Sequence, residues 1–297
     1  MTVDLAPGSQ AWASRVSPSK LAAILGVSPW ESPRSLWHKM RGDVPWGETN
    51  VDQERGHLLE AAVLEWWRRR HPDHTDWADQ PSFTPAEWLV ATPDAICTDS
   101  AERVLVEAKT SADYDAFGEP GTDEIPTYYL TQVYFAAHLA VLAGEPITRI
   151  YVPLLGPRLR FEEYVVEYDP EIGQQLMATA ERWRDMLLTD EAPDLDDTVA
   201  TFDVMRKLHP EIERGTEVKV ALEVGRALVE GAAALKAAEA ADRLARSTVL
   251  EQMGRAQYAT CDGVRVARRQ PRGEAVTFVV VGKPTDLTPD TDEESAA

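Results

Sequence analysis

The chain has 297 residues, a formal net charge of −20 at pH 7 and an apolar fraction of 44%. This length can bury a sizeable core and predicts one large domain or a domain with an appended module. No run approaches the ~18 apolar residues of a membrane helix, and the N-terminus has no secretory signal. The acidic charge argues against a protein that coats nucleic acid nonspecifically, but it leaves room for an enzyme with a local basic track. Cys97 and Cys261 are too few for a disulfide framework or a four-cysteine iron–sulfur cluster, which fits a reducing cytoplasm. We therefore expect a cytoplasmic protein, and the lack of a long apolar run predicts no membrane contact.

Helices and strands alternate along the first 190 residues, as caps, breakers and apolar periodicity indicate. The helix at 50–70 is capped by Thr49 or Asn50 and ends in a basic turn before Pro72. Such alternation around a mixed sheet is typical of an α/β fold. The predicted helices cover residues 17–26, 33–41, 50–70, 126–143 and 170–188, and the predicted strands cover 88–97, 103–109, 147–155 and 160–168, with a turn at 98–101.

The chain changes character after an Asp-rich stretch at 190–197. A long Ala-, Glu- and Arg-rich helix is expected over 217–258, with glycines that make a break plausible, and it packs either on the domain or on another subunit. A short hairpin should close this part of the chain. We therefore predict three parts, which are a core over 1–190, a C-terminal helical arm and β-hairpin over 191–284, and an acidic disordered tail over 285–297.

Two short predicted strands carry the most informative polar residues. Side chains alternate along a strand, so Glu107 and Lys109 share the face of Leu105, and Asp94 follows Pro93 just before. Mg²⁺ prefers oxygen ligands, and two carboxylates with a backbone carbonyl suffice to hold it. A lysine beside them can orient or deprotonate a water that attacks a phosphodiester. The alternative is an edge strand with ordinary surface charges.

Two further polar residues lie on otherwise apolar helix faces. Glu60 precedes Trp67 by seven positions on one face, and such a carboxylate must titrate, bind a metal or pair with an arginine such as Arg55. Gln132 is surrounded by aromatic and aliphatic residues at helical spacing, and a buried amide needs both donors and acceptors. It either caps a sheet edge or faces a metal-bound phosphate.

Together these segments resemble the YqaJ-type viral recombinases, relatives of the phage lambda exonuclease within the PD-(D/E)XK nuclease superfamily. The resemblance spans roughly residues 10 to 150, in matching order and spacing. The matching segments are SPSKLAAILGVSPWESPRSLW with Ser19, Arg55-Gly56-His57-Leu58-Leu59-Glu60, Pro93-Asp94, Glu107-Ala108-Lys109-Thr110, and Ile125-Pro126 with Tyr129-Leu130-Thr131-Gln132.

This resemblance implies a restriction-endonuclease-like core, with a mixed central β-sheet flanked by helices. It implies a 5′-phosphate pocket at Ser19 and Arg15, with Tyr129 and Gln132 also beside the substrate. The sequence departs from the family at Lys20, where an Asp is usual. The implied catalytic residues are Asp94, Glu107, Lys109, Glu60 and Gln132, and the implied metal ligands are Asp94, Glu107, the carbonyl of Ala108, and Glu60.

The activity implied by the resemblance is Mg²⁺-dependent exonuclease digestion of linear double-stranded DNA, with Mn²⁺ as an alternative metal. Digestion would run 5′ to 3′ and leave 3′ overhangs for a single-strand annealing partner. Family members form homo-oligomers, in several cases a ring, in which Arg265, Arg268, Arg269 and Arg272 would line the channel or else belong to a solvated hairpin. The alternatives are a restriction-like or repair endonuclease and a noncatalytic DNA-binding or assembly subunit. A phage origin would place the protein in the bacterial host cytoplasm.

Overall fold

A computed structural model describes residues 9–47, 50–273 and 275–287, which divide into two compact units, Met1–Ile212 and Glu213–Ala297. The sequence places the boundary earlier, after residue 190. The difference arises from helix α7 (Val199–Leu208), which the sequence did not predict and which packs against α3. The hydroxyl of Thr201 on α7 lies 2.7 Å from that of Ser32 at the start of α3, and both residues are buried.

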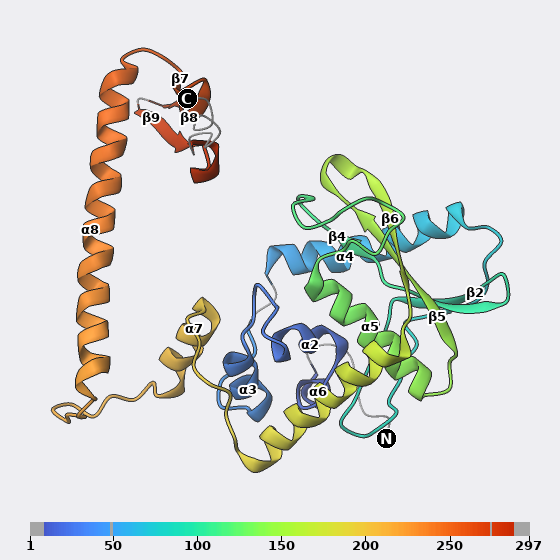
Figure 1. Ribbon diagram of the computed structural model, residues 1–297. Coiled ribbons are helices and arrows are strands. Elements are labelled where there is room, and N and C mark those ends of the chain that lie inside the picture. Colours follow the sequence, from blue (N-terminus) through green and yellow to red (C-terminus); the bar gives the residue numbers. More distant parts are fainter. Residues whose placement is uncertain (1–8, 48–49, 274, 288–297) are drawn as a thin grey trace, which may run out of the picture. The chain divides into compact units, whose positions relative to one another are not determined.

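A six-stranded mixed sheet forms the centre of the first unit (Figure 1). Its strands run in the order β1-β2-β3-β5, with β4 continuing β3 along β5 and with β6 on the other side of β5. Pairing is antiparallel except where β3 and β4 run parallel to β5. The predicted α/β class with a mixed central sheet is therefore confirmed. The strands are β1 (Thr75–Asp79), β2 (Ala95–Asp99), β3 (Glu102–Val106), β4 (Lys109–Thr110), β5 (Ile147–Leu155) and β6 (Phe161–Glu167).

Helices α2 to α6 begin and end close to the predicted residues, whereas α1 was not predicted. Asn50 caps α4 through a reciprocal pair of hydrogen bonds with Gln53, whereas Thr49 lies outside the described residues. Ser17 precedes α2, but its hydroxyl lies 3.1 Å from that of Ser19 and makes no cap hydrogen bond. No helix of the described ranges is long and apolar enough to cross a membrane. The helices are α1 (Gln10–Ala13), α2 (Pro18–Ile24), α3 (Pro33–Arg41), α4 (Val51–Arg70), α5 (Thr127–Leu142) and α6 (Pro170–Thr189).

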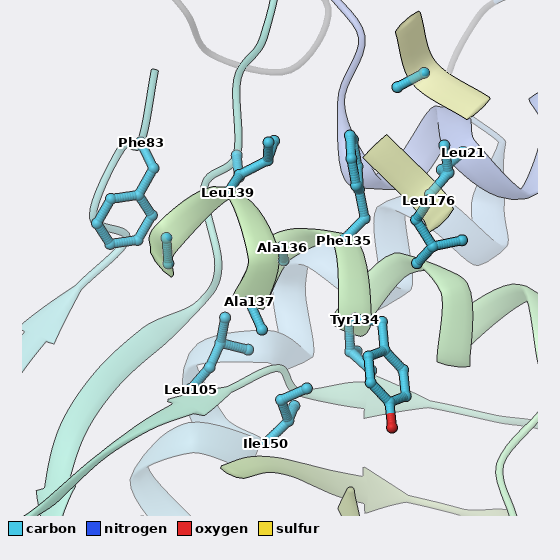
Figure 2. Close-up of a cluster of buried hydrophobic side chains, with 14 of the residues drawn as sticks. Leu21, Phe83, Leu105, Tyr134, Phe135, Ala136, Ala137, Leu139, Ile150 and Leu176 are labelled. Atoms are coloured by element: carbon cyan, nitrogen blue, oxygen red, sulfur yellow. The ribbon is translucent and has the colours of Figure 1, made fainter. Parts of the chain in front are cut away.

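Helix α5 is the centre of the main hydrophobic core (Figure 2). Its buried residues pack against Leu105 of β3 and Ile150 of β5 on one side, and against Leu21 of α2 and Leu176 of α6 on the other. A second core lies where α4 meets the sheet, around the fully buried Trp67. The sheet is thus covered by α4 and by α5, and both helices carry predicted site residues.

In the second unit, α8 (Leu222–Met253) is one continuous helix that includes Gly225 and Gly231. It ends at Gly254, whose φ of 48° lies in the left-handed region that glycine tolerates. The predicted hairpin is β8 (Val264–Arg272) with β9 (Ala275–Val280), but a third strand, β7 (Tyr258–Cys261), extends it to a three-stranded sheet. The predicted disordered tail lies largely outside the described residues, which end in a short 3-10 helix at Pro284–Leu287.

Candidate active site

The strand from β3 into β4 places its side chains on the two faces that the alternation predicted. Leu105 points into the core around α5, whereas Val104, Val106 and Ala108 belong to the core under α4. Between β3 and β4 the register along β5 is unbroken, since the Glu107 N–H donates to the Tyr151 carbonyl at 3.0 Å. Glu107 and Lys109 therefore face α5 from adjacent positions of the same face.

A short hydrogen-bond network joins the predicted site residues of β3, β4 and α5 with Asp94. The Ala108 N–H donates to Oδ2 of Asp94 at 2.7 Å, and the Asp94 N–H lies 3.4 Å from Oε2 of Glu107. Oε1 of Glu107 accepts from Nζ of Lys109 at 2.9 Å and from Nε2 of Gln132 at 2.7 Å. The amide of Gln132 on α5 thus serves the carboxylate directly and does not cap a sheet edge.

Negative charge dominates this network. Burial, together with the charges of Glu107 and Glu60, raises the pKa of Asp94 well above its usual range. Burial alone would lower the pKa of Lys109, but Glu107 and Asp94 outweigh it, so the pKa of Lys109 is raised and its ammonium is held charged. Asp94 thus feels two further carboxylates and one ammonium, an excess of negative charge that a divalent cation would relieve.

Glu60 lies at the edge of this cluster. Its neighbours Val63, Leu64 and Trp67 are buried as predicted, while its own side chain keeps 25% exposure. It accepts a hydrogen bond from Gln80 at 3.2 Å and lies 3.9 Å from Nδ1 of His57. Arg55, which the sequence offered as an alternative partner of Glu60, forms an ion pair with Asp52 instead.

The oxygen donors of this cluster fit Mg²⁺, which takes one or two carboxylates and keeps several waters. Asp94 accepts from the Ala108 N–H, its own N–H lies against the Glu107 carboxylate, and the Ala108 carbonyl is the predicted third oxygen. In the described residues no group of three or more His, Cys, Asp or Glu side chains is arranged to hold a metal ion. The assignment of Glu60, Asp94, Glu107 and the Ala108 carbonyl as metal ligands stays a prediction.

Gln80 is a positioning residue that sequence reasoning missed. Its N–H donates to the Asp94 carbonyl at 2.9 Å, while its side chain donates to Glu60. The residue follows β1 with a φ of 45°. No strand was predicted there, because residues 75–79 lack a clear alternation, so nothing in the sequence drew attention to Gln80.

The predicted 5′-phosphate residues lie on and before α2. Ser19 is exposed, and its hydroxyl lies beside that of Ser17. The guanidinium of Arg15 donates to the carbonyls of Glu87 at 2.6 Å and Ala11 at 3.1 Å, so it holds backbone in this conformation. No hydrogen bond within the described residues joins either side chain to Asp94 or Glu107. A phosphate site at these residues stays a prediction.

Lys20, the departure from the family pattern, points inward. Its Nζ donates to the carbonyls of Trp12, Ala13 and Arg15 at 2.7, 3.0 and 2.6 Å, and it lies 3.9 Å from the centre of the Trp12 ring. Lys20 is only 3% exposed, and burial lowers its pKa to about 7. The side chain therefore ties the N-terminal segment to α2 and takes no part in the carboxylate cluster.

The lowered pKa of Lys20 predicts a pH-dependent stability. Between about pH 7 and its usual pKa of 10.5, the unfolded chain binds a proton at Lys20 that the folded chain releases. The free energy of unfolding should therefore rise with pH in this window, by at most about 1.4 kcal/mol per pH unit. Urea denaturation of the unaltered chain and of Lys20→Met across this window tests it. The variant should lack this contribution, and an unchanged slope would contradict the assignment.

The four predicted channel arginines lie on β8 of the second unit. The guanidinium of Arg265 stacks on Tyr258 with its centre 4.3 Å from the ring, and Nε of Arg269 donates to the Ala256 carbonyl at 2.8 Å. Arg268 and Arg272 are exposed on the same strand. This cluster is basic within an otherwise acidic chain, and its role as a DNA-contacting surface stays a prediction.

Fold and site thus define a class of protein. It is an α/β unit with a carboxylate–lysine cluster at the junction of β2, β3 and β4. Residues 9–143 match the YqaJ-like viral recombinase domain family. The chain is 27% identical over 215 residues to the uncharacterized protein YqaJ of Bacillus subtilis, a match that covers 67% of this chain and 62% of that protein. The chain thus spans less than two thirds of the length of that relative.

Two solved structures are similar to this chain in fold, with low TM-scores. An alkaline exonuclease from Laribacter hongkongensis has a TM-score of 0.44 and 13% identity, covering 60% of this chain and 90% of that one. A phage-related exonuclease from Haemophilus somnus has a TM-score of 0.41 and 12% identity, covering 60% and 96%. Scores of this size assign no activity. The family match does confirm the resemblance predicted from the sequence, because residues 9–143 match the model of the YqaJ-like viral recombinase domain.

Proposed function

We propose that this chain is a divalent-metal-dependent deoxyribonuclease that digests linear double-stranded DNA from its ends. The observation that carries the proposal is the hydrogen-bonded set of Asp94, Glu107, Lys109 and Gln132 within a YqaJ-like domain. The site would work in the cytoplasm, without a membrane.

The residues of the chain divide the work of hydrolysis. Asp94 and Glu107 would hold Mg²⁺, or Mn²⁺ in its place, with the Ala108 carbonyl. A bound divalent ion supplies charge neutralisation for the phosphate and an activated water. The Lys109 ammonium orients the attacking water and stabilises negative charge on the phosphate oxygens. Gln132 fixes the rotamer of Glu107 through its amide, so that the carboxylate is in place before substrate binds.

We further propose that digestion runs 5′ to 3′ and leaves 3′ overhangs for a single-strand annealing protein. Polarity would come from a 5′-phosphate site at Ser19 and Arg15, after a rotation that frees the Arg15 guanidinium from its carbonyl partners. A homo-oligomeric, trimeric ring with the β8 arginines towards the DNA would let an acidic chain remain on its substrate.

Digestion of defined DNA substrates tests these proposals together. Linear duplexes with 5′-phosphate, 5′-hydroxyl or blocked ends and a covalently closed circle are each incubated with the chain, with and without Mg²⁺. We expect metal-dependent loss of the linear forms, fastest with 5′-phosphate, and no cutting of the circle. Cutting of the circle would favour the restriction-like or repair endonuclease, and no cutting with any divalent metal would favour a noncatalytic DNA-binding subunit.

A further inference from the structure

A row of aromatic rings leads away from Lys109 along the start of α5. The centre of the Tyr129 ring lies 5.2 Å from Nζ of Lys109. The Tyr128 ring follows, 4.5 Å from that of Tyr129, and the Trp30 ring lies 4.8 Å from that of Tyr128 in an edge-to-face contact. This aromatic row, Tyr129-Tyr128-Trp30, therefore connects the candidate active site with the loop after α2.

Trp30 is the exposed end of the aromatic row. It is 65% exposed, although a large indole is normally buried because its apolar surface is costly in water. The loop that presents it is held by backbone, since the N–H groups of Val27 and Ser28 both donate to the Ala22 carbonyl at 2.9 and 3.1 Å. Oγ of Ser28 in turn accepts from the N–H of Glu31 at 3.2 Å. The loop is thus held in place by hydrogen bonds, and the Trp30 side chain is not part of the hydrophobic core.

An open pocket of about 520 Å³ lies beside the aromatic row. Its walls are the loop after α2 and the first turn of α5, and none of its lining residues is charged. This lining suits a flat, uncharged and largely apolar group, and the hydroxyls of Ser28, Thr127 and Tyr128 can contact its polar edge. The lining residues are Gly26, Val27, Ser28, Pro29, Ala116, Ile125, Pro126, Thr127 and Tyr128.

The pocket lies one turn of α5 from the residue that contacts the Glu107 carboxylate. Tyr128 lies one turn before Gln132, whose amide donates to Glu107, so about 6 Å separate the two positions along the helix. Successive bases of a stacked strand are about 3.4 Å apart. A phosphate held at Glu107 would therefore bring a base one or two nucleotides away to Tyr128.

We propose that this pocket and the aromatic row bind one unpaired nucleobase of the DNA strand, next to the phosphate that is cut. Every base has a π-face, so stacking on Trp30 and Tyr128 is tolerant of sequence, as an end-digesting enzyme requires. Stacking also offsets the cost of taking a base out of its pair. The inference rests on the proposed function and adds a base-binding subsite to it.

The test measures binding of the full chain to DNA in EDTA, so that no cutting occurs. Fluorescence anisotropy compares a 5′-phosphorylated duplex carrying a short unpaired 5′ overhang with the same duplex whose overhang is abasic. Trp30→Ala and Tyr128→Ala should each weaken binding to the base-bearing overhang about tenfold and leave binding to the abasic one unchanged. Trp30→Phe should retain binding. Phe202→Ala, which removes an aromatic side chain that is 64% exposed on α7, is the matched control without effect.

Each outcome separates the subsite from the nuclease. If the variants lose binding equally on both DNAs, or on neither, the proposed subsite is wrong. Mg²⁺-dependent digestion by the same preparations would still support the nuclease function. A base-dependent loss in a chain that cuts no DNA with any divalent metal would support the subsite and overturn the nuclease. A chain that binds neither DNA would overturn both.

Discussion

Replacing Asp94 with Asn is expected to lower the rate of metal-dependent DNA hydrolysis about a thousandfold while leaving the fold intact. The amide oxygen can still accept the Ala108 N–H that now bonds to Oδ2 at 2.7 Å, so the local backbone keeps its partner. The charge that would hold the metal is lost, and metal stabilisation of a phosphoryl transition state is worth several kcal/mol, or about three factors of ten.

The stability of Asp94→Asn provides an independent measurement. A carboxyl whose pKa is raised in the folded state costs stability once it is ionised, and Glu107 and Glu60 add to this cost. The melting temperature in EDTA should therefore stay the same or rise. The matched control is Asp99→Asn at the other end of β2, which loses the ion pair with Arg149 and should lower stability without lowering the rate. Retained hydrolysis by Asp94→Asn would mean that the metal site lies elsewhere.

The parts of the site that could be predicted from the sequence depend on local periodicity. A period of two placed Glu107 and Lys109 on one face of the strand and Val106 on the other, and the two cores confirm this division. A period of 3.6 identified Gln132 as a polar residue on an apolar helix, and its amide meets Glu107 in the structure. Such residues can be identified from the sequence because burial of an unpaired polar group is costly. A single polar residue on an apolar face therefore indicates that it has a partner in the fold.

The parts that could not be predicted depend on contacts distant in sequence. Gln80 contacts Asp94 because β1 pairs with β2, and no sequence pattern in residues 75–79 predicts that pairing. Lys20 stands where the resemblance implies an Asp, but its Nζ is bound by the carbonyls of Trp12 and Ala13 in α1 and of Arg15 just after it. The last carbonyls of a helix have no partner within the helix, and no residue type signals where a distant side chain will meet them. Arg15 is likewise held by the Ala11 carbonyl of α1, and by that of Glu87.

Replacing Lys109 with Met is expected to lower the hydrolysis rate by about a hundredfold to a thousandfold and to lower stability as well. Methionine has a similar length and is apolar, so it fills the space under Tyr129 without an ammonium for the phosphate or the attacking water. Within the described part of the chain, Glu107 would then keep only Gln132 as a side-chain partner, and its side chain is 8% exposed. Removing one partner of a buried ion pair costs about 3 kcal/mol, because the other charge stays buried.

Lys39→Met is the matched control, since Lys39 also pairs with a largely buried carboxylate, Glu31 on the segment before α3. This control should lose stability and keep its rate, so a rate loss specific to Lys109→Met cannot be attributed to partial unfolding. Addition of Mg²⁺ should restore part of the stability of Lys109→Met, because a divalent ion at Asp94 and Glu107 replaces the missing positive charge, whereas it should not rescue Lys39→Met. Thermal melts with and without Mg²⁺, beside single-turnover cleavage of a linear duplex, measure both effects. Unaltered cleavage by Lys109→Met would leave its ammonium with a structural role only, as the counter-charge that keeps Glu107 folded in place.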